Sequence, residues 1–249
     1  MERVSFYIDG FNFFHGLRRM RSKDSDWQKF YWIDIVKLFR QFVGENQILQ
    51  KVYYFSAPDH EPDRLLRQRV LFQANERING SVFEVINGMF YRKKVTCKTC
   101  FNRFFTYEEK LTDVNISINM LDDCFLNDVD TLVLVSADSD LLSTLQRINE
   151  RFPGKKLRVY FPPGNTSSAL MTYMRATRQK VIALEKSKRL FNNAVMPDTI
   201  TTKDGSSFTV PLKWKSYTPS SHAPSPFPIV VNATCPHCNR TIIIPNQIH

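Results

Sequence analysis

The chain has 249 residues, 43% of them hydrophobic, which is enough for one large domain or for one domain and a small module. No apolar run approaches the roughly 20 residues that a membrane span needs, and the first residues lack a signal-peptide pattern, so we expect a soluble, cytoplasmic protein. The net charge of +10 and the sequence pI near 9.4 favour a polyanionic partner, most often nucleic acid, over an ordinary basic surface.

Short apolar runs alternate with helical patterns along most of the chain. The runs expected to form strands are Arg3–Asp9, Gln50–Ser56, Val82–Ile86, Thr131–Ser136, Leu157–Phe161 and a short last one, Val181–Leu184. The expected helices are Tyr31–Val43, Asp63–Asn79, Asp113–Leu126, Asp138–Arg151 and Ser167–Arg178. Repeated β-α-β units predict an α/β fold with a parallel sheet and right-handed crossovers. In the helix Asp113–Leu126, one apolar face is expected to hold Val114, Ile118, Leu121 and Phe125.

The composition changes near residue 192, since eight of the thirteen prolines lie between Pro197 and Pro245. Residues 219–226 are typical of a linker. After them, the apolar runs 229–231 and 241–244 flank a Cys-Pro-His-Cys segment, as the strands of a small hairpin would. We therefore expect one domain over residues 1–190, with an inserted segment at 91–107, and a Pro-rich extension with a cysteine knuckle over residues 191–249.

Carboxylates stand where two of the apolar runs end. Asp9 closes the first run, and Asp138 and Asp140 directly follow Thr131–Ser136. Ligands of open α/β sheets bind beyond the carboxyl ends of the strands, and neighbouring strands lie about 4.8 Å apart, so these carboxylates should lie within a few Å of one another. A divalent cation would remove their repulsion, and oxygen ligands suit Mg²⁺ or Mn²⁺. The alternative is that each acid, Asp113 included, caps a turn or a helix.

Such a cluster fits the hydrolysis of a phosphodiester. In a two-metal site, carboxylates hold cations about 3.5–4 Å apart; one cation lowers the pKa of the attacking water and the other stabilises the leaving oxygen. Asn12 can hold a carboxylate or a metal-bound water. The sequence shows neither a P-loop nor a Gly-x-Gly-x-x-Gly motif.

The order and spacing of three short segments are similar to those of a known protein family. They are Tyr7–Asn12, Glu109–Asn115 and Ser136–Asp140, and the likeness continues through Tyr53–Ala57, Arg67-Gln68 and Gly88–Phe90. Over roughly residues 3 to 185 the chain resembles the NYN family of PIN-like nucleases. The resemblance implies a PIN-like three-layer α/β/α sandwich and Mg²⁺- or Mn²⁺-dependent cleavage of RNA.

The resemblance also assigns residues. Asp9, Asp113, Asp138 and Asp140 fall on the family's acidic, metal-binding positions, and Asn12 falls on its characteristic amide. Many relatives carry a further acid six residues after the position of Asp113, where this chain has Asn119. The carbonyl oxygen of Asn119 can still bind a metal, but it brings no charge, which weakens the case for a full two-metal site.

Four of the five cysteines form two CxxC pairs, Cys97/Cys100 and Cys235/Cys238. One pair supplies half of a structural zinc site, because tetrahedral zinc needs four ligands. We expect the tail to fold back so that the two pairs share one zinc; two incomplete knuckles or reduced thiols are the alternatives. Cys124 stands alone and is expected to be a packing residue.

Basic residues gather in clusters that are candidates for binding nucleic acid. They are Arg18, Arg19, Arg92, Lys93, Lys94, Arg175 and Arg178. The inserted segment also carries aromatic residues, Phe101, Phe104, Phe105 and Tyr107, which could stack unpaired bases or cover the zinc site. The expected partner is RNA in single-stranded form; homo-oligomerisation is left open.

The sequence thus predicts a metal-dependent ribonuclease. The alternative is a catalytically weak member of the NYN family that binds RNA or another partner, and a third hypothesis is a DNA nuclease.

Overall fold

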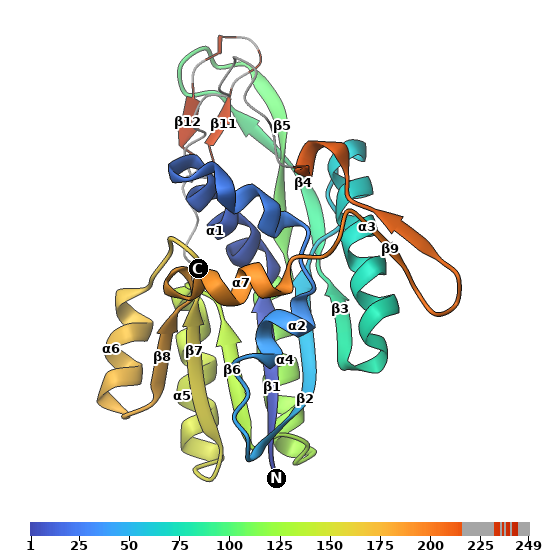
Figure 1. Ribbon diagram of the computed structural model, residues 1–249. Coiled ribbons are helices and arrows are strands. Elements are labelled where there is room, and N and C mark those ends of the chain that lie inside the picture. Colours follow the sequence, from blue (N-terminus) through green and yellow to red (C-terminus); the bar gives the residue numbers. More distant parts are fainter. Residues whose placement is uncertain (216–231, 235, 237, 240, 244–249) are drawn as a thin grey trace.

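A six-stranded, all-parallel sheet forms the centre of the molecule (Figure 1). The structure is a computed structural model that describes residues 1–215, 232–234, 236, 238–239 and 241–243. In spatial order the strands are β3 (Phe83–Asn87), β2 (Gln47–Ser56), β1 (Glu2–Asp9), β6 (Thr131–Val135), β7 (Lys156–Phe161) and β8 (Lys180–Ala183). The parallel α/β sheet expected from the alternating pattern is therefore confirmed.

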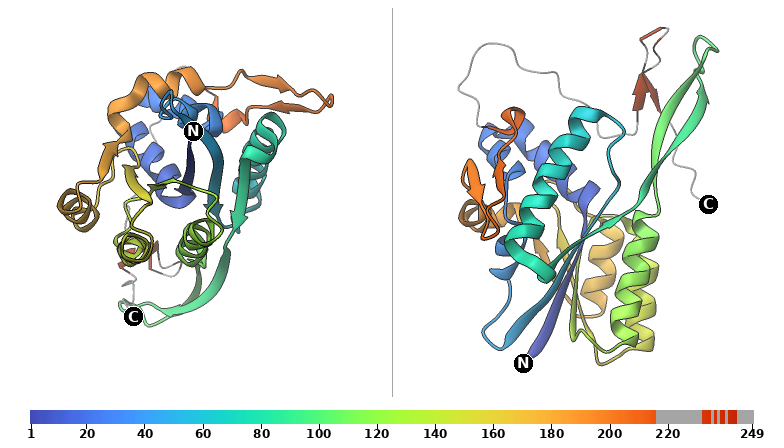
Figure 2. Two further views of the ribbon diagram at one scale, coloured as in Figure 1. Left: turned by 90° about the horizontal axis from the view of Figure 1, so that it is seen from below. Right: turned by 90° about the vertical axis from the view of Figure 1, so that its right-hand side faces the viewer.

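Helices cover both faces of the sheet, which gives three layers (Figure 2). One face packs against α1 (Gly10–Lys23), α2 (Ile35–Arg40), α3 (Pro62–Asn79) and α7 (Lys188–Ala194). The other face packs against α4 (Thr112–Phe125), α5 (Leu142–Arg151) and α6 (Ser168–Ala176). Adjacent residues of β1 alternate between these two cores, with Phe6 and Ile8 in one and Tyr7 in the other, as the two-residue period of a strand requires.

The region after β1 differs from the sequence prediction. α1 was not predicted, and the helix expected over Tyr31–Val43 shrinks to α2 (Ile35–Arg40), preceded by a 3₁₀ segment, Ser25–Tyr31. The sequence pattern does not indicate the start of α1, because Asp9 is both the last residue of β1 and the N-cap of α1. No turn residues therefore separate the strand from the helix. The strand passes into the helix at Gly10.

The buried face of α4 is not the predicted one. Val114, Ile118 and Phe125 are 52%, 57% and 72% exposed. The helix instead buries Thr112, Ile116, Met120, Asp123 and Cys124. Tyr7 and Tyr53 donate hydrogen bonds to the two carboxylate oxygens of Asp123, at 2.5 and 3.3 Å, which ties this acid to the sheet. The apolar pattern misleads because a hydrogen-bonded carboxylate occupies the buried face.

A long two-stranded hairpin, here called the arm, projects beyond the carboxyl edge of the sheet (Figures 1 and 2). Its antiparallel strands are β4 (Met89–Thr96) and β5 (Arg103–Lys110), which fill the chain between β3 and α4. A second small hairpin, β11 (Asn232–Thr234) and β12 (Thr241–Ile243), lies beside the tip of the arm. This is the hairpin expected around the second CxxC pair; Cys235, His237 and residues 229–231 and 244 lie outside the described residues.

The chain after α7 packs back on the first core. Met196, Val210 and Trp214 are buried there, and the Trp32 indole donates a hydrogen bond of 2.8 Å to the Pro197 carbonyl. Strands β9 (Thr199–Thr201) and β10 (Ser207–Thr209) form a hairpin in this segment. The division into residues 1–190 and 191–249 stays a prediction. In the described part of the chain, no helix combines the length and the apolar character that a membrane crossing requires.

Gly10 has no room for a side chain. A Cβ at this position would lie 2.4 Å from Cε1 of Tyr54 and 2.6 Å from the carbonyl oxygen of Phe55, and both residues are buried in the sheet. We expect Gly10→Ala to lower the free energy of unfolding by about 1–3 kcal/mol through overpacking. Urea unfolding checks this, with Gly154→Ala as control because no atom lies within 4 Å of its Cβ. Equal midpoints for the two variants would contradict the prediction.

Candidate functional site

The site lies where β1 and β6 run side by side. Their register pairs Ile8 with Val135, so Asp9 at the end of β1 adjoins Ser136 just after β6. The strand order reverses its direction at this point, with β2 and β3 to one side and β7 and β8 to the other. A crevice beyond the carboxyl ends at such a switch point is the usual ligand site of an open α/β sheet.

Asp9 is buried and held by three hydrogen bonds. Its Oδ1 accepts from the Asn12 backbone N–H at 3.0 Å, and its Oδ2 accepts from the Asn12 side-chain amide at 2.6 Å and from the Ser136 hydroxyl at 2.7 Å. The role of helix cap and that of cluster member are therefore combined in one residue. Because each carboxylate oxygen has two lone pairs, Oδ1 keeps one that can bind a cation.

Asp138 and Asp140 follow Ser136 in one turn. The Ser136 hydroxyl accepts a hydrogen bond from the Asp138 backbone N–H at 3.0 Å, and Oδ1 of Asp138 accepts from the Asp140 N–H at 2.9 Å. Asp138 thus caps the 3₁₀ turn Ser139–Leu141, as the alternative interpretation of this acid had it. Its second carboxylate oxygen accepts no hydrogen bond within the described residues. Ser136 links this turn to Asp9.

Asp113 and Glu109 enter from the opposite side, at the root of the arm. Asp113 lies in the first turn of α4, and Glu109 lies near the end of β5. The Thr112 hydroxyl donates a hydrogen bond of 2.6 Å to Oε1 of Glu109. The arm therefore contributes a fifth acid, Glu109. This residue belongs to the sequence segment Glu109–Asn115 but was not predicted as a site residue.

Burial and the negative charges of the cluster raise the pKa of three of its acids. Burial raises the pKa of Asp113 to about 7, and the negative charges of Asp9, Asp138, Asp140 and Glu109 add to the shift. Burial also raises the pKa of Asp9 against its own hydrogen bonds, with a further contribution from Asp138. The pKa of Glu109 is raised by burial first, opposed by its hydrogen bond from Thr112, with the charge of Asp9 adding to the rise.

In the part of the chain that the structure describes, no basic side chain forms an ion pair with this cluster. Among the ion pairs of the described residues, none involves Asp9, Glu109, Asp113, Asp138 or Asp140. A protein of net charge +10 therefore concentrates uncompensated negative charge at one edge of its sheet. Carboxylates in this state attract divalent cations.

The carboxylates do not form a closed metal cage in the described part of the chain. Within the described residues, the one set of three or more Cys, His, Asp or Glu side chains whose ligand atoms all lie within 4.8 Å of one another consists of cysteines. The acids are thus spread more widely than the sequence analysis expected, because they come from three separate elements and two of them cap turns. Mg²⁺ tolerates this, since it usually keeps several waters and takes one or two carboxylates plus substrate phosphates.

Two amides complete the surroundings of Asp9. The Asn12 side chain donates to Asp9, and its Oδ1 accepts from Asn165 Nδ2 at 3.0 Å. Asn165, in the loop after β7, was not predicted, because a single amide in a loop leaves no pattern. Asn119 is not brought to the cluster: it lies six residues beyond Asp113, about 9 Å along the helix axis, and its amide donates to the Asn115 carbonyl.

The predicted basic residues divide into three places. Arg19 lies at the carboxyl edge, where it donates to the Gly164 carbonyl at 2.5 Å, and Arg18 lies beside it. Burial and the charges of Arg18, Arg19 and Arg64 lower the pKa of His15 to about 4, so this imidazole is neutral at pH 7; its ring packs at a tilt against Phe11, with the ring centroids 4.1 Å apart. Arg92, Lys93 and Lys94 lie on the arm.

Arg175 and Arg178 are not brought near the carboxylates. They lie at the end of α6 and just before β8, where the neighbouring Gln179 accepts a hydrogen bond of 3.3 Å from the backbone of Leu157, close to the start of β7. Strands begin at the amino edge of the sheet, so these two arginines lie at the edge opposite to the acids.

Three cysteines meet at the tip of the arm. The ligand atoms of Cys97, Cys100 and Cys238 lie within 4.8 Å of one another, and the sulfurs of Cys97 and Cys238 are 3.8 Å apart. Phe104 packs over Cys97 in a small cluster, so one of the predicted aromatics covers this site, whereas Phe101 is exposed. Cys124 packs inside the α4 core, as expected.

The residue that follows each CxxC pair has the same backbone conformation. The residue after each pair, Phe101 and Asn239, has a positive φ, of 57° and 52°. A bulky residue in this conformation is uncommon and costs free energy that the surroundings must supply. Each CxxC pair lies in the chain between the two strands of a hairpin, β4 and β5 for the first pair and β11 and β12 for the second.

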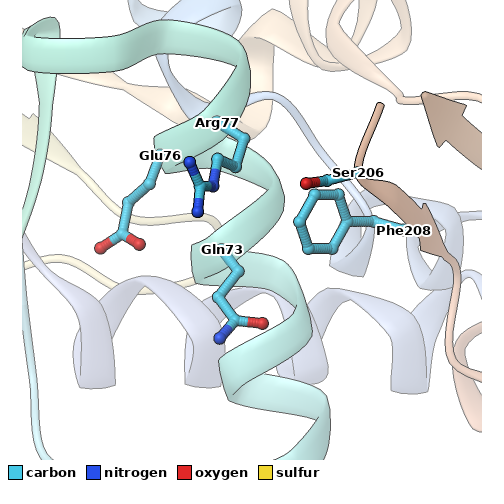
Figure 3. A pocket seen from close by; sticks show the side chains of 5 residues that line it. All are labelled: Gln73, Glu76, Arg77, Ser206 and Phe208. Carbon is cyan, nitrogen blue, oxygen red and sulfur yellow. The ribbon is translucent and has the colours of Figure 1, made fainter. Parts of the chain in front are cut away.

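Two surface cavities lie elsewhere. One of about 420 Å³ is lined by Gln73, Glu76, Arg77, Ser206 and Phe208, between α3 and β10 (Figure 3). Another, of about 820 Å³, lies between the same end of α3 and β9. Neither is lined by an acid of the cluster.

A family model with the description "NYN domain" matches residues 3–178. The chain belongs to the NYN domain family. The NYN family is one of PIN-like, nuclease-like proteins, and divalent metals and RNA are typical of it.

Two individual proteins are also similar. The 6-hydroxy-3-succinoylpyridine 3-monooxygenase HspA of Pseudomonas putida is 25% identical over 179 residues, which is 59% of this chain and 55% of that protein. The chain thus spans about half the length of this curated relative. A crystal structure of VPA0982, a protein of unknown function from Vibrio parahaemolyticus, is 20% identical with a TM-score of 0.49, covering 74% of this chain and 93% of that one.

The raised pKa of Asp113 predicts a specific pH dependence of stability. Below pH 4 the carboxyl holds its proton in both states; between pH 4 and 7 only the folded state holds it, so rising pH removes stability until the loss is complete above pH 7. In metal-free buffer, Asp113→Asn should therefore be more stable than wild type at pH 8, by about 1–3 kcal/mol, and no more stable at pH 4. Urea unfolding across this range measures the difference; a difference independent of pH would contradict the assignment.

Proposed function

We propose that this protein is a Mg²⁺- or Mn²⁺-dependent ribonuclease that hydrolyses phosphodiester bonds at the carboxyl edge of its sheet. The observation that carries the proposal is the cluster of Asp9, Glu109, Asp113, Asp138 and Asp140, which form no ion pair among the described residues. Burial and the neighbouring negative charges raise the pKa of Asp9, Glu109 and Asp113. Membership of the NYN family supports the same chemistry.

The residues divide their tasks by position. Asp9, Asp113 and Asp138 would hold the cation, with Asp140 and Glu109 adding negative charge around it. Asn12 and Ser136 orient Asp9 through three hydrogen bonds, and Asn165 orients Asn12. When bound, the metal supplies a more acidic water and a counter-charge for the phosphate. The role of Asn119 as a ligand stays a prediction.

RNA is the proposed substrate, because the protein has an excess of ten positive charges and an open acidic edge. Arg18 and Arg19 on α1, and the basic arm, flank this edge from two sides. Arg175 and Arg178 at the opposite edge remain candidates for contacts with distant parts of a long RNA.

A second ion belongs to this proposal, a structural Zn²⁺ bound by Cys97, Cys100 and Cys238. Zinc–sulfur bonds of about 2.3 Å in a tetrahedron place neighbouring sulfurs about 3.8 Å apart. The sulfurs of Cys97 and Cys238 have this spacing, and the residue that follows each CxxC pair has a positive φ. Cys235, the fourth ligand predicted from the sequence, lies outside the described residues.

A catalytically weak binding module is the second candidate function. The observation that favours it is the uncharged Asn119, in place of an acid that many relatives carry. In that case the cluster binds a cation and the RNA but does not cut it.

Cleavage of a labelled single-stranded RNA separates the two candidates. We expect wild type to cut in the presence of Mn²⁺ or Mg²⁺, and Asp9→Asn and Asp138→Asn to lower the rate at least about 100-fold, since each removes a charge that holds the cation. Arg147→Ala, an exposed change on α5, serves as control and should cut at the wild-type rate. RNA that stays intact with every metal, although bound, would replace the nuclease by the binding module; a preference for DNA would support the third hypothesis.

The zinc site predicts a zinc content that depends on cysteines of the arm and of the tail. Wild type should contain one zinc per chain, and Cys97→Ser and Cys238→Ser should each lose most of it, because three thiolates hold zinc far less well than four. Elemental analysis after dialysis measures this, with Cys124→Ser as the control that should keep its zinc. Cys235→Ser tests the remaining ligand. Zinc retained in Cys238→Ser would show that the tail is not part of the site.

A further inference from the structure

We propose that one face of the arm is a binding track for single-stranded RNA that ends at the carboxylate cluster. The inference rests on the proposed function for the identity of the polymer, and it goes beyond that function by naming the surface and the residues that hold the strand. It is carried by the strand register of the arm and by the contacts on its two faces.

The register of β4 and β5 sorts the arm's side chains into two faces. Residues opposite each other in an antiparallel pair point to the same side, and side chains alternate along each strand. One face, here called the open face, carries the pairs Thr96–Arg103, Lys94–Phe105, Arg92–Tyr107 and Phe90–Glu109. The other, the closed face, carries Val95–Phe104, Lys93–Thr106, Tyr91–Glu108 and Met89–Lys110. The six outer residues of the open face are all exposed, whereas on the closed face Met89, Tyr91 and Lys110 are exposed and the other five residues are not.

The open face alternates cations with aromatic rings. Arg92 lies over the ring of Phe105, with its guanidinium carbon 3.5 Å from the ring centroid. Within the described residues no carboxylate forms an ion pair with Arg92, Lys94 or Arg103. Uncompensated cations attract phosphates, and the exposed rings of Phe105 and Tyr107 offer surfaces on which unpaired bases can stack.

On the closed face the charged side chains are paired, and the apolar residues near the tip are packed. Glu108 forms ion pairs with Lys93 at 3.1 Å and Lys110 at 2.7 Å. Nearer the tip, Val95 and Phe104 pack with Cys97, so this face supports the cysteine site. The two faces therefore differ in function although each carries lysines and aromatic residues.

The open face leads to the acids. Its last pair contains Glu109, whose carboxylate interacts with Asp9 and Asp113. Just before it, His60 stacks on Tyr107 at 4.0 Å and meets the edge of Phe90 at 5.5 Å, which holds the root of the arm against the loop before α3. The track from Arg103 to Glu109 covers six residue steps, or about 20 Å.

A single strand fits this surface better than a duplex. In a duplex the bases are paired and stacked on one another, so the rings of Phe105 and Tyr107 would have no base to contact. A single strand can place phosphates on Arg92, Lys94 and Arg103 and bases on the rings between them. The strand would then reach the carboxylates with its backbone exposed.

Matched substitutions on the two faces test the track. Lys94→Ala and Phe105→Ala change the open face; Lys93→Ala and Tyr91→Ala make equivalent changes on the closed face, where Tyr91 is 53% exposed against 49% for Phe105. Binding of a labelled single-stranded RNA is followed by fluorescence anisotropy without added Mg²⁺ or Mn²⁺, over a range of salt concentrations. Zinc content and thermal unfolding of each variant show that the arm is intact.

We expect Phe105→Ala to weaken binding about fivefold or more, the loss of one stacked base. Lys94→Ala should lower the salt dependence by about 0.7 in the slope of log K against log salt, the loss of one phosphate contact. The closed-face variants should bind within about twofold of wild type, and Phe105→Ala should bind duplex RNA like wild type. Equal losses on both faces, or none on the open face, would overturn the track.

The RNA-binding track and the nuclease activity can fail independently of each other. If RNA binds through the open face but is never cut, the track stands and the nuclease proposal fails. If RNA is cut by wild type and by the open-face variants with the same KM, the nuclease stands and the track fails.

Discussion

The pairing of β1 with β6 is the constraint on which the site depends. It places Asp9 next to Ser136, whose hydroxyl donates to Asp9 and accepts from the backbone of Asp138, so one serine joins acids that are 129 residues apart in the chain. The burial that this pairing creates raises the pKa of Asp9. Burial also raises the pKa of Asp113 and Glu109, and the negative charge of Asp9 adds to both shifts. The remaining groups, Asn12 and Asn165, hold this arrangement in place.

Much of this could be predicted from the sequence, because a buried parallel strand leaves a strong signal. Apolar runs that stop at Asp9 and before Asp138 gave both the strands and the edge at which the acids meet. The prediction failed where one residue serves two elements, as Asp9 does at the start of α1, and where a hydrogen-bonded acid replaces an apolar residue, as Asp123 does on α4. Glu109 and Asn165 could not be assigned because their positions follow from the arm and a loop, which have no periodic pattern.

The arm gives this α/β domain features of its own. It joins three parts of the molecule that the sequence keeps apart: its root supplies Glu109, its open face carries the uncompensated cations, and its tip brings Cys97 and Cys100 to Cys238. The family model covers the arm but stops at residue 178, so Cys238 comes from outside the matched region. A metal at the tip would keep the arm from moving as a free hairpin, which on its own is only marginally stable.

The central claim is that the acids at the carboxyl edge bind a divalent cation in contact with Asp9 and Asp113. Anomalous X-ray scattering from crystals grown with Mn²⁺ tests it most directly, because it locates the ion independently of activity. The account predicts a manganese peak between the carboxylates of Asp9, Asp113 and Asp138, absent from crystals of Asp9→Asn. A manganese peak only elsewhere, or none at a concentration that supports cleavage, would contradict it.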